Sequence, residues 1–415
     1  MDQITLPFVG LKNSKSDEAI PSWYGVEFDT AISAPTCTRI GDLDLHRTLP
    51  IHNRMKGCLL NDAGEVVKYL APNDWTAEVR DGSLGQVMIE LPEHYRRFET
   101  DGTKRRVMIS TYPIPGYHLV RKRYVSAYEA TIKRSDTTLC SVVNMDADYR
   151  GGAPSGTDNP YLLGCPATGL SRTEFRNYAR KRKAGSAEWN CLTYDICKEL
   201  YWLFVIEYAT LNSQTAFNAK KDSDGYAQGG LGDGVSNFDR SLTRPCIPCG
   251  YTDSIGNGSG ELPCVVRDNE GSTFATTMVP RYRGIENPFG HILKWIDGIN
   301  VSADQKVFVC ADPSKFSDDE YDDYFYVGNI PLKDGYIKEL IFGEDGEIIP
   351  SVVGGSSTTY FCDYLLVDIS MSETIIPVKY GGNMIQNARC GLVQIGIYSE
   401  ISNVCGSRLC FIPKI

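Results

Sequence analysis

Three short segments near the end of the chain decide the expected fold: YRGIENPFGHILKWIDG (residues 282–298), KYGGNM (379–384) and CGSRLCF (405–411). Each combines glycine with bulky apolar residues, but shows neither the alternation of a strand nor the period of a helix. Glycine is needed where φ is positive or where two backbones touch, and Trp295 offers a large apolar surface whose N–H needs a partner. We therefore expect irregular but tightly packed backbone in a loop-rich fold.

Taken in order, these segments resemble the core of the C-type-lectin fold as it occurs in the formylglycine-generating (sulfatase-modifying) enzyme family. In that family an N-x-x-G stretch leads into a Gly/Trp segment, which is followed by a glycine-pair turn and a terminal G-x-R strand. The resemblance implies an α+β, C-type-lectin-like fold with many short strands, two helices and long loops. It also implies a structural core that contains Asn287, Gly290, Trp295, Gly381, Gly382, Gly406 and Arg408.

The resemblance covers residues 91–415, and the chain is long enough for more than one folded unit. Residues 1–90 contain short alternating stretches such as GEVVKYL (64–70) and GQVMIEL (85–91), which are separated by turn signals. We expect residues 1–90 to form a β-rich docking or stem region, followed by the C-type-lectin-like domain with its ligand-binding face near the C-terminus.

Two segments carry helix signals. The first begins at Ser171, where Glu174 completes an S-x-x-E capping box, and is expected to end near residue 184. The second spans residues 192–211 and is apolar on more than one face. A helix of that kind must be largely buried.

The chain of 415 residues has a formal net charge of −10. Nucleic-acid phosphates are bound by clustered Lys and Arg, so this acidic balance argues against a nucleic-acid partner. The one basic stretch, RNYARKRK (176–183), is interpreted as the solvated face of a helix. No run reaches about 18 apolar residues, and the first residues lack the blocks of a signal peptide. We expect the chain to be made in the cytosol and not to be inserted into a membrane.

Fourteen cysteines are spread through the chain among apolar neighbours, which is typical of reduced core thiols. The resembled enzymes oxidise cysteine with a pair of active-site thiols. Here Cys405 and Cys410 fall on the terminal G-x-R segment, away from the position of those thiols. We therefore expect a non-catalytic chain without a cofactor or metal.

Other patterns leave alternatives open. Cys246 and Cys249 form a C-x-x-C pair that either contributes to a zinc site or packs as two loop thiols. The acidic stretch SDDEYDDY (317–324) offers oxygens for Ca²⁺, but it lacks the spaced D-x-D-x-D-G pattern, so a solvated, self-repelling loop is the favoured interpretation. His291 is interpreted as a hydrogen-bonded core histidine rather than a general base.

The run GGNMIQNARCGLVQIGIYSEISNVCGSRLCF (381–411) alternates positions expected to be fixed with amide, aromatic and hydroxyl residues. It resembles the variable ligand-binding face of bacteriophage receptor-binding proteins and of proteins diversified by diversity-generating retroelements. Side chains of these types combine contact area with adaptable hydrogen bonds. The contacts implied by the resemblance are Asn383, Met384, Ile385, Gln386, Asn387, Arg389, Gln394, Tyr398 and Glu400; the alternative is that several of them merely cover the core.

The resemblance implies a bacteriophage virion protein, such as a tail or head fibre, that binds a host cell-surface polysaccharide or protein. Its other expected partners are further virion proteins and copies of itself in a homotrimer. Two alternatives from other classes remain: a sulfatase-modifying-type oxidoreductase that uses its cysteines, and a purely structural capsid or tail decoration protein.

Overall fold

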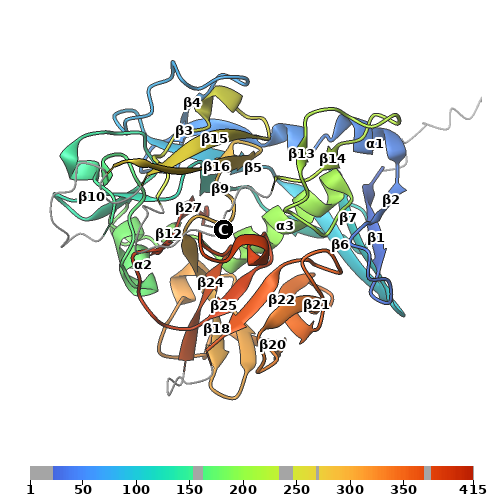
Figure 1. Cartoon of the computed structure of the whole chain (residues 1–415). Coiled ribbons are helices and arrows are strands. Elements are labelled where there is room, and N and C mark those ends of the chain that lie inside the picture. Colours follow the sequence, from blue (N-terminus) through green and yellow to red (C-terminus); the bar gives the residue numbers. More distant parts are fainter. Residues whose placement is uncertain (1–21, 153–161, 233–245, 268–270, 369–374, 415) are drawn as a thin grey trace, which may run out of the picture.

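The computed structural model of the chain describes residues 22–152, 162–232, 246–267, 271–368 and 375–414. Strands dominate these residues, which also contain the helices α1 (Leu43–Thr48), α2 (Arg172–Arg180) and α3 (Tyr194–Tyr208) (Figure 1). This mostly β architecture with few helices is compatible with the expected α+β class. Within the described ranges, no helix combines the length and apolar composition that a bilayer span requires.

The first sheet contains five antiparallel strands in the order β2-β1-β7-β6-β8. Their bounds are Tyr24–Asp29 for β1, Thr38–Gly41 for β2, His94–Asp101 for β6, Lys104–Ser110 for β7 and His118–Val120 for β8. Val26 of β1 and its partner Val107 of β7 are fully buried. One face of this sheet therefore packs on the core.

The second sheet has the order β12-β27-β9-β5-β3-β4. Its strands are β3 (Lys56–Leu60), β4 (Val66–Tyr69), β5 (Gln86–Leu91), β9 (Arg123–Ser126), β12 (Trp189–Cys191) and β27 (Leu409–Phe411). The expected boundary at residue 90 falls inside β5, which pairs with β3 on one side and β9 on the other. Residues from both sides of that boundary thus form one continuous sheet.

The third sheet belongs to the C-terminal part of the chain and is coloured orange to red in Figure 1. Its order is β20-β19-β18-β24-β25-β23-β21-β22, and β26 pairs in parallel with the start of β18. The bounds are β18 (Leu293–Ser302), β19 (Lys306–Val309), β20 (Phe325–Asn329), β21 (Gly335–Phe342), β22 (Glu347–Val353), β23 (Tyr364–Val367), β24 (Ile375–Tyr380), β25 (Ile395–Ile397) and β26 (Cys405–Gly406).

Most of the remaining strands pair in smaller sheets. They pair β10 (Thr131–Lys133) with β11 (Thr138–Cys140), β13 (Phe217–Asn218) with β14 (Gln228–Gly229), and β15 (Gly260–Arg267) with β16 (Thr273–Tyr282) and β17 (Ile285–Glu286).

Helix α3 lies between the N-terminal and C-terminal sheets at the centre of Figure 1. All its residues except Asp195 are buried, and its apolar side chains share one core cluster with residues of β1, β7, β18, β24 and β25. The expectation of a largely buried second helix is therefore confirmed. The helix is shorter than expected because Ala209 adopts a left-handed conformation (φ 52°) that caps it.

Helix α2 begins as expected. The Ser171 side chain accepts from the backbone N–H of Glu174, and the Glu174 carboxylate accepts from the backbone N–H of Ser171, which completes the capping box. The helix ends at Arg180, a few residues earlier than predicted.

Candidate functional site

The three glycine-bearing segments meet in the C-terminal sheet. Trp295 on β18 is paired with Lys379 on β24, and Gly406 on β26 lies opposite Lys294. The backbone N–H of Gly290 donates to the carbonyl of Gly381 at 2.9 Å. Segments that are far apart in the sequence thus form one continuous platform.

The seven residues expected in the structural core are all buried: Asn287, Gly290, Trp295, Gly381, Gly382, Gly406 and Arg408. The indole N–H of Trp295 donates to the carbonyl of Leu170 at 2.8 Å, which satisfies the buried donor. Gly381 and Gly382 both have positive φ (89° and 78°), the conformation that glycine adopts without strain.

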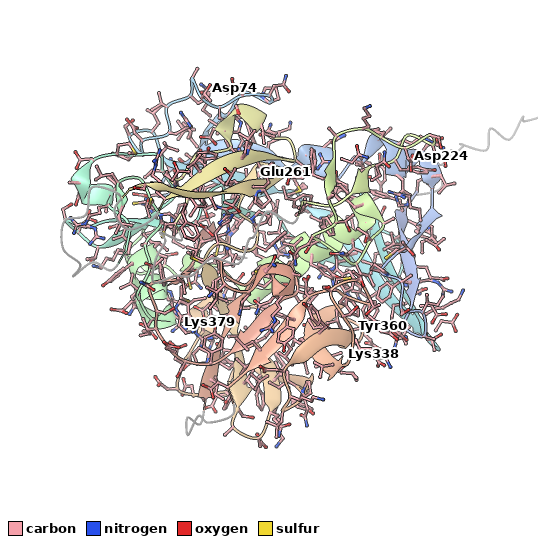
Figure 2. The ribbon with its side chains drawn as sticks, viewed as in Figure 1. Asp74, Asp224, Glu261, Lys338, Tyr360 and Lys379 are labelled. Atoms are coloured by element: carbon pink, nitrogen blue, oxygen red, sulfur yellow. The ribbon has the colours of Figure 1, made fainter. Side chains whose placement is uncertain are left out.

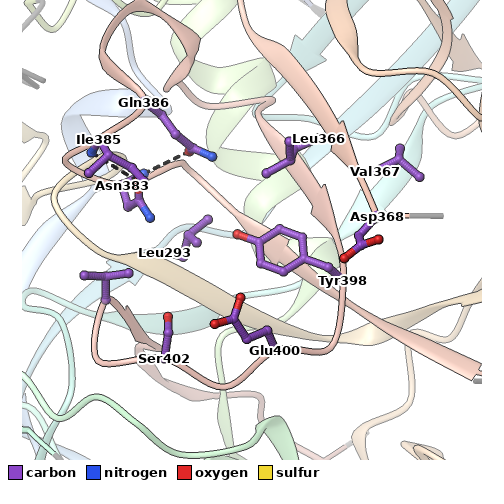
Figure 3. A pocket seen from close by; sticks show the side chains of 11 residues that line it. Leu293, Leu366, Val367, Asp368, Asn383, Ile385, Gln386, Tyr398, Glu400 and Ser402 are labelled. Carbon is purple, nitrogen blue, oxygen red and sulfur yellow. Dashed lines mark hydrogen bonds between the residues drawn. The ribbon is translucent and has the colours of Figure 1, made fainter. Parts of the chain in front are cut away.

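A groove of about 500 Å³ opens on this platform, and we name it the first groove (Figure 3). It collects apolar and polar side chains from β18, from the end of β23 and from the segments before and after β25. It is lined by Leu293, Leu366, Val367, Asp368, Asn383, Ile385, Gln386, Tyr398, Glu400, Ser402 and Val404. Its volume lies within the range of small-ligand sites, roughly 300–1,000 Å³.

The groove brings together several of the contacts expected from the sequence: Asn383, Ile385, Gln386, Tyr398 and Glu400. Local hydrogen bonds hold the loop that carries three of them. The Asn383 side-chain oxygen accepts from the Ile385 N–H at 3.2 Å, and the Gln386 side-chain oxygen accepts from the Asn383 N–H at 3.1 Å. The oxygens of both amides thus serve the loop (Figure 3), and of the two side chains only that of Gln386 is partly exposed.

Three of the expected contacts are buried: Asn383 (4% exposed), Met384 and Gln394. Only Asn383 still lines the first groove, so the sequence-based expectation is corrected for the other two. Met384 is 1% exposed and packs in a small cluster with Val266 and Val404. Gln394 is fully buried beside β25. Neither side chain can reach a ligand at the surface, because the irregular loop turns Met384 inward and the sheet covers Gln394.

Asn387 and Arg389 are exposed but lie outside the lining of the first groove. The Arg389 guanidinium instead stacks on the ring of Tyr364, 4.7 Å from its centroid.

Sequence reasoning missed the other lining residues, among them Leu366, Val367 and Asp368. They reach the groove because β23 pairs in parallel with β25, with Leu366 opposite Gly396. Nothing local in the sequence marks this pairing, since β23 reads as an ordinary apolar strand. Ser402 and Val404, by contrast, lie in the same polar-rich run that drew attention to the face.

Lys379 is buried within the C-terminal sheet, beside the first groove (Figure 2). Its ammonium lies 3.7 Å from the centroid of the Tyr398 ring and 4.4 Å from that of the Trp295 ring, and it donates to the carbonyl of Glu400. Burial lowers the pKa of Lys379 to about 8. Two ring faces and a carbonyl therefore surround a cation that has lost most of its water.

The thiols considered for catalysis are buried. Burial raises the pKa of Cys405 to about 12, and it raises the pKa of Cys410 well above its ordinary value. The Cys410 thiol points to the carbonyl of Cys191 at 2.8 Å. Both thiols are protonated near neutral pH, whereas the thiolate is the reactive form.

The C-x-x-C pair is also held in its neutral form, since burial raises the pKa of both Cys246 and Cys249. The Cys249 thiol donates to the carbonyl of Glu129 at 3.4 Å. In the part of the chain that the structure describes, no three His, Cys, Asp or Glu residues are grouped so as to hold a metal ion. His291 is buried, its Nε2 lies 3.3 Å from the carbonyl of Met278, and burial lowers its pKa to about 4.

The basic and acidic stretches meet each other, which corrects two expectations. Arg176 is not solvated: its guanidinium holds the buried carboxylate of Asp297 in a bidentate pair at 2.6 and 2.9 Å. Asp318 of the acidic stretch is bound by Arg172, Thr173 and Arg176, and the two arginines hold the pKa of Asp318 well below its usual range. Asp318 thus docks this loop on α2 by ion pairs, whereas the remaining carboxylates of the stretch are exposed, as expected for a solvated loop: Asp319, Glu320, Asp322 and Asp323.

No protein-family model and no curated protein matches the chain. Among solved structures it is similar to PvdO from Pseudomonas aeruginosa, with 10% sequence identity and a TM-score of 0.32, over 79% of this chain and 95% of that one. Similarity at this level assigns neither a family nor an activity to the chain.

Proposed function

We propose that this chain is a non-catalytic adhesin that binds a polysaccharide of a host cell surface in the first groove. The binding domain is proposed to be C-type-lectin-like, on the sequence resemblance of its glycine- and tryptophan-bearing segments. The single observation that carries the proposal is the convergence of Asn383, Ile385, Gln386, Tyr398 and Glu400 on one groove.

The chemistry of the groove suits a sugar. Leu293, Leu366 and Ile385 supply apolar wall, on which the C–H faces of a sugar ring can pack, while Tyr398 adds an aromatic ring. The carboxylates of Asp368 and Glu400 accept hydrogen bonds from sugar hydroxyls. Side-chain amide nitrogens of the groove donate hydrogen bonds to sugar hydroxyls. The same two carboxylates repel anionic sugars, which favours a neutral polysaccharide.

The enzyme alternative receives no support from the proposed thiols. Cys405 and Cys410 are buried and protonated, and neither lines the first groove. A nucleophile needs both access to substrate and a base or a lowered pKa. We therefore retain a binding function.

On the resemblance to phage receptor-binding proteins, we further propose that the chain is carried on a bacteriophage virion as a tail or head fibre, as a homotrimer. Antibodies against the purified chain should then block adsorption of the particle to its host. Unhindered adsorption in the presence of saturating antibody would contradict this part of the proposal.

Binding at the groove is tested by titrating the purified full chain with neutral, amino and acidic surface polysaccharides. Ile385→Ala and Glu400→Gln should each weaken binding of a neutral polysaccharide about tenfold, which corresponds to about 1.4 kcal/mol. Arg389→Ala is the matched control, because this exposed residue shares the loop but lies outside the groove. Equal affinities for all three variants and the parent, or binding of acidic polysaccharides alone, would refute the proposal.

A structural role in the virion is the second candidate, and one observation favours it. The side chains of Phe325 and Tyr326 on β20, at one end of the strand order of the C-terminal sheet, are 75% and 55% exposed. Single exposed apolar side chains are common, but a contiguous apolar patch marks an interaction surface, and Phe325 would contribute to one if a partner packs on this edge. If this were the main role, Phe325→Asp would abolish incorporation into particles, whereas Ile385→Ala would leave host binding unchanged.

A further inference from the structure

A second groove of about 490 Å³ lies on the same platform. Its walls come from the start of α2, the acidic loop, β18, β24 and the segment after β25. It is lined by Ser171, Arg172, Thr173, Trp295, Asp318, Asp319, Ile375, Pro377, Ser399 and Ile401. None of these residues is among the contacts expected from the sequence, although Ser399 and Ile401 fall within the run 381–411.

The two grooves share one wall, which we name the ridge: residues 398–402. Tyr398, Glu400 and Ser402 line the first groove, whereas Ser399 and Ile401 line the second. This alternation follows from extended backbone, in which successive side chains point to opposite sides. The wall between the two grooves is therefore a single segment of chain.

Lys379 contacts residues that line both grooves. Its ammonium contacts the ring of Tyr398, which lines the first groove, and the ring of Trp295, which lines the second. It also donates to the carbonyl of Glu400 in the ridge itself. One buried cation thus fixes the shared wall and an aromatic side chain on each side of it.

The second groove repeats the chemistry of the first. Trp295, Pro377 and Ile401 form apolar wall, and the polar lining includes the hydroxyls of Ser171, Thr173 and Ser399. Arg172 and Asp318 form an ion pair, with Nε 2.7 Å from Oδ1, so their charges offset each other. The remaining charged group of the lining is the carboxylate of Asp319. Both grooves therefore favour a neutral, hydroxyl-rich ligand over an anionic one.

We infer that the two grooves are consecutive subsites for one neutral polysaccharide chain, which crosses the ridge between them. The inference rests on the proposed function of the first groove and adds a second site and a length requirement. The shared wall is a single segment of chain, so one polysaccharide chain can cross it and occupy both sides. A ligand that fills both subsites gains affinity from the effective concentration of its second half.

The test uses the purified full chain and size-fractionated fragments of dextran, mannan, galactan and N-acetylglucosamine polymers, from disaccharide to decasaccharide. Calorimetric titration should show affinity that rises by on the order of 10- to 100-fold with fragment length and then levels off. Two matched variants, Ile385→Ala in the first groove and Ile401→Ala in the second, distinguish the contributions of the two grooves to affinity. They are comparable because both remove an isoleucine side chain, which is 42% exposed at residue 385 and 49% exposed at residue 401.

Ile385→Ala should weaken the binding of short and long fragments alike. Ile401→Ala should weaken only long fragments, about tenfold, and leave the affinity for disaccharides unchanged. Thermal unfolding of both variants should match the parent, because these two side chains are exposed at the groove surface. Phe325→Ala lies outside both grooves and should leave the affinity for fragments of every length unchanged.

The outcomes distinguish the two proposals. If Ile385→Ala weakens binding but affinity does not depend on length and Ile401→Ala is silent, the second subsite is refuted while the first groove stands. If no fragment of any length binds, or if Ile385→Ala is silent, the proposed function fails and the second subsite fails with it.

Discussion

The ammonium of Lys379 lies 3.7 Å from the centroid of the Tyr398 ring. This contact joins strand β24 to the ridge that divides the two grooves, and the same ammonium lies 4.4 Å from the centroid of the Trp295 ring. The position of an aromatic side chain on the candidate binding face is therefore set by a cation that lies beneath it. Several measurable properties depend on this arrangement.

Replacing Lys379 by methionine should lower saccharide affinity without lowering the thermal stability of the protein. Met keeps much of the volume but removes the cation–π contacts and the hydrogen bond to the Glu400 carbonyl, so Tyr398 and the ridge lose their anchor. Saccharide affinity should fall about tenfold, which is about 1.4 kcal/mol. Because burial disfavours the charge, the thermal midpoint should be equal to that of the parent or higher. A strongly lowered midpoint with unchanged affinity would show that Lys379 is only a core residue.

The stability of the protein should depend on Lys379 at alkaline pH. Burial lowers its pKa from 10.5 to about 8, so between these values the unfolded chain holds a proton that the folded protein has released. The free energy of unfolding from this group should therefore rise with pH, by at most about 1.4 kcal/mol per pH unit.

This contribution is measured by urea denaturation from pH 8 to pH 10, as the difference between the parent and Lys379→Met. The comparison is needed because Cys405, whose pKa burial raises from 9.0 to about 12, acts in the opposite direction in both proteins. A difference that does not change with pH would contradict the lowered pKa.

The ion pair between Arg176 and Asp297 should matter far more than an exposed pair on the same stretch. Arg176→Met leaves the fully buried Asp297 carboxylate with less compensation and should cost about 3–5 kcal/mol of unfolding free energy. Lys183→Met, which removes the half-exposed pair with Glu188, should cost less than about 1 kcal/mol. Urea denaturation of both variants provides the measurement, and similar losses in the two would argue against a buried network under α2.

Gly382 should tolerate no side chain. Its φ is 78°, and a Cβ would lie 2.5 Å from the Cys390 sulfur. Gly185 is a matched control, because its φ is 77° and no atom lies within 4 Å of its added Cβ. Gly185→Ala should cost about 1 kcal/mol from the left-handed backbone, whereas Gly382→Ala should add a steric cost of about 1–3 kcal/mol. Equal destabilisation in thermal or urea unfolding would mean that the turn relaxes freely.

Local patterns predicted local features well. The capping box at Ser171 and Glu174 was predictable because both residues lie within one helical turn. The burial of α3 followed from apolar residues on several faces, and the burial of Trp295 and the glycine pair followed from residue types that suit packed, irregular backbone. Each of these predictions needs only residues that are neighbours in the sequence.

The binding face could be predicted only in part. Ile385, Tyr398 and Glu400 do line the first groove, but Met384 and Gln394 are buried in the same stretch. In a regular strand the alternation of side chains would have separated the two groups, but the loop between β24 and β25 has no fixed period. Its direction at each residue depends on hydrogen bonds such as that between Gln386 and Asn383.

The sequence by itself determined the composition of the chain, the start of α2, the buried character of α3 and the positions where packed glycine was required. Only the tertiary structure decided which side chains face a ligand, because the first groove depends on the parallel pairing of β23 with β25 and the second on the approach of α2 to β18. The same holds for the partners of Lys379 and Arg176. Contacts between residues far apart in the chain depend on how whole strands and helices pack, and no local pattern encodes that packing.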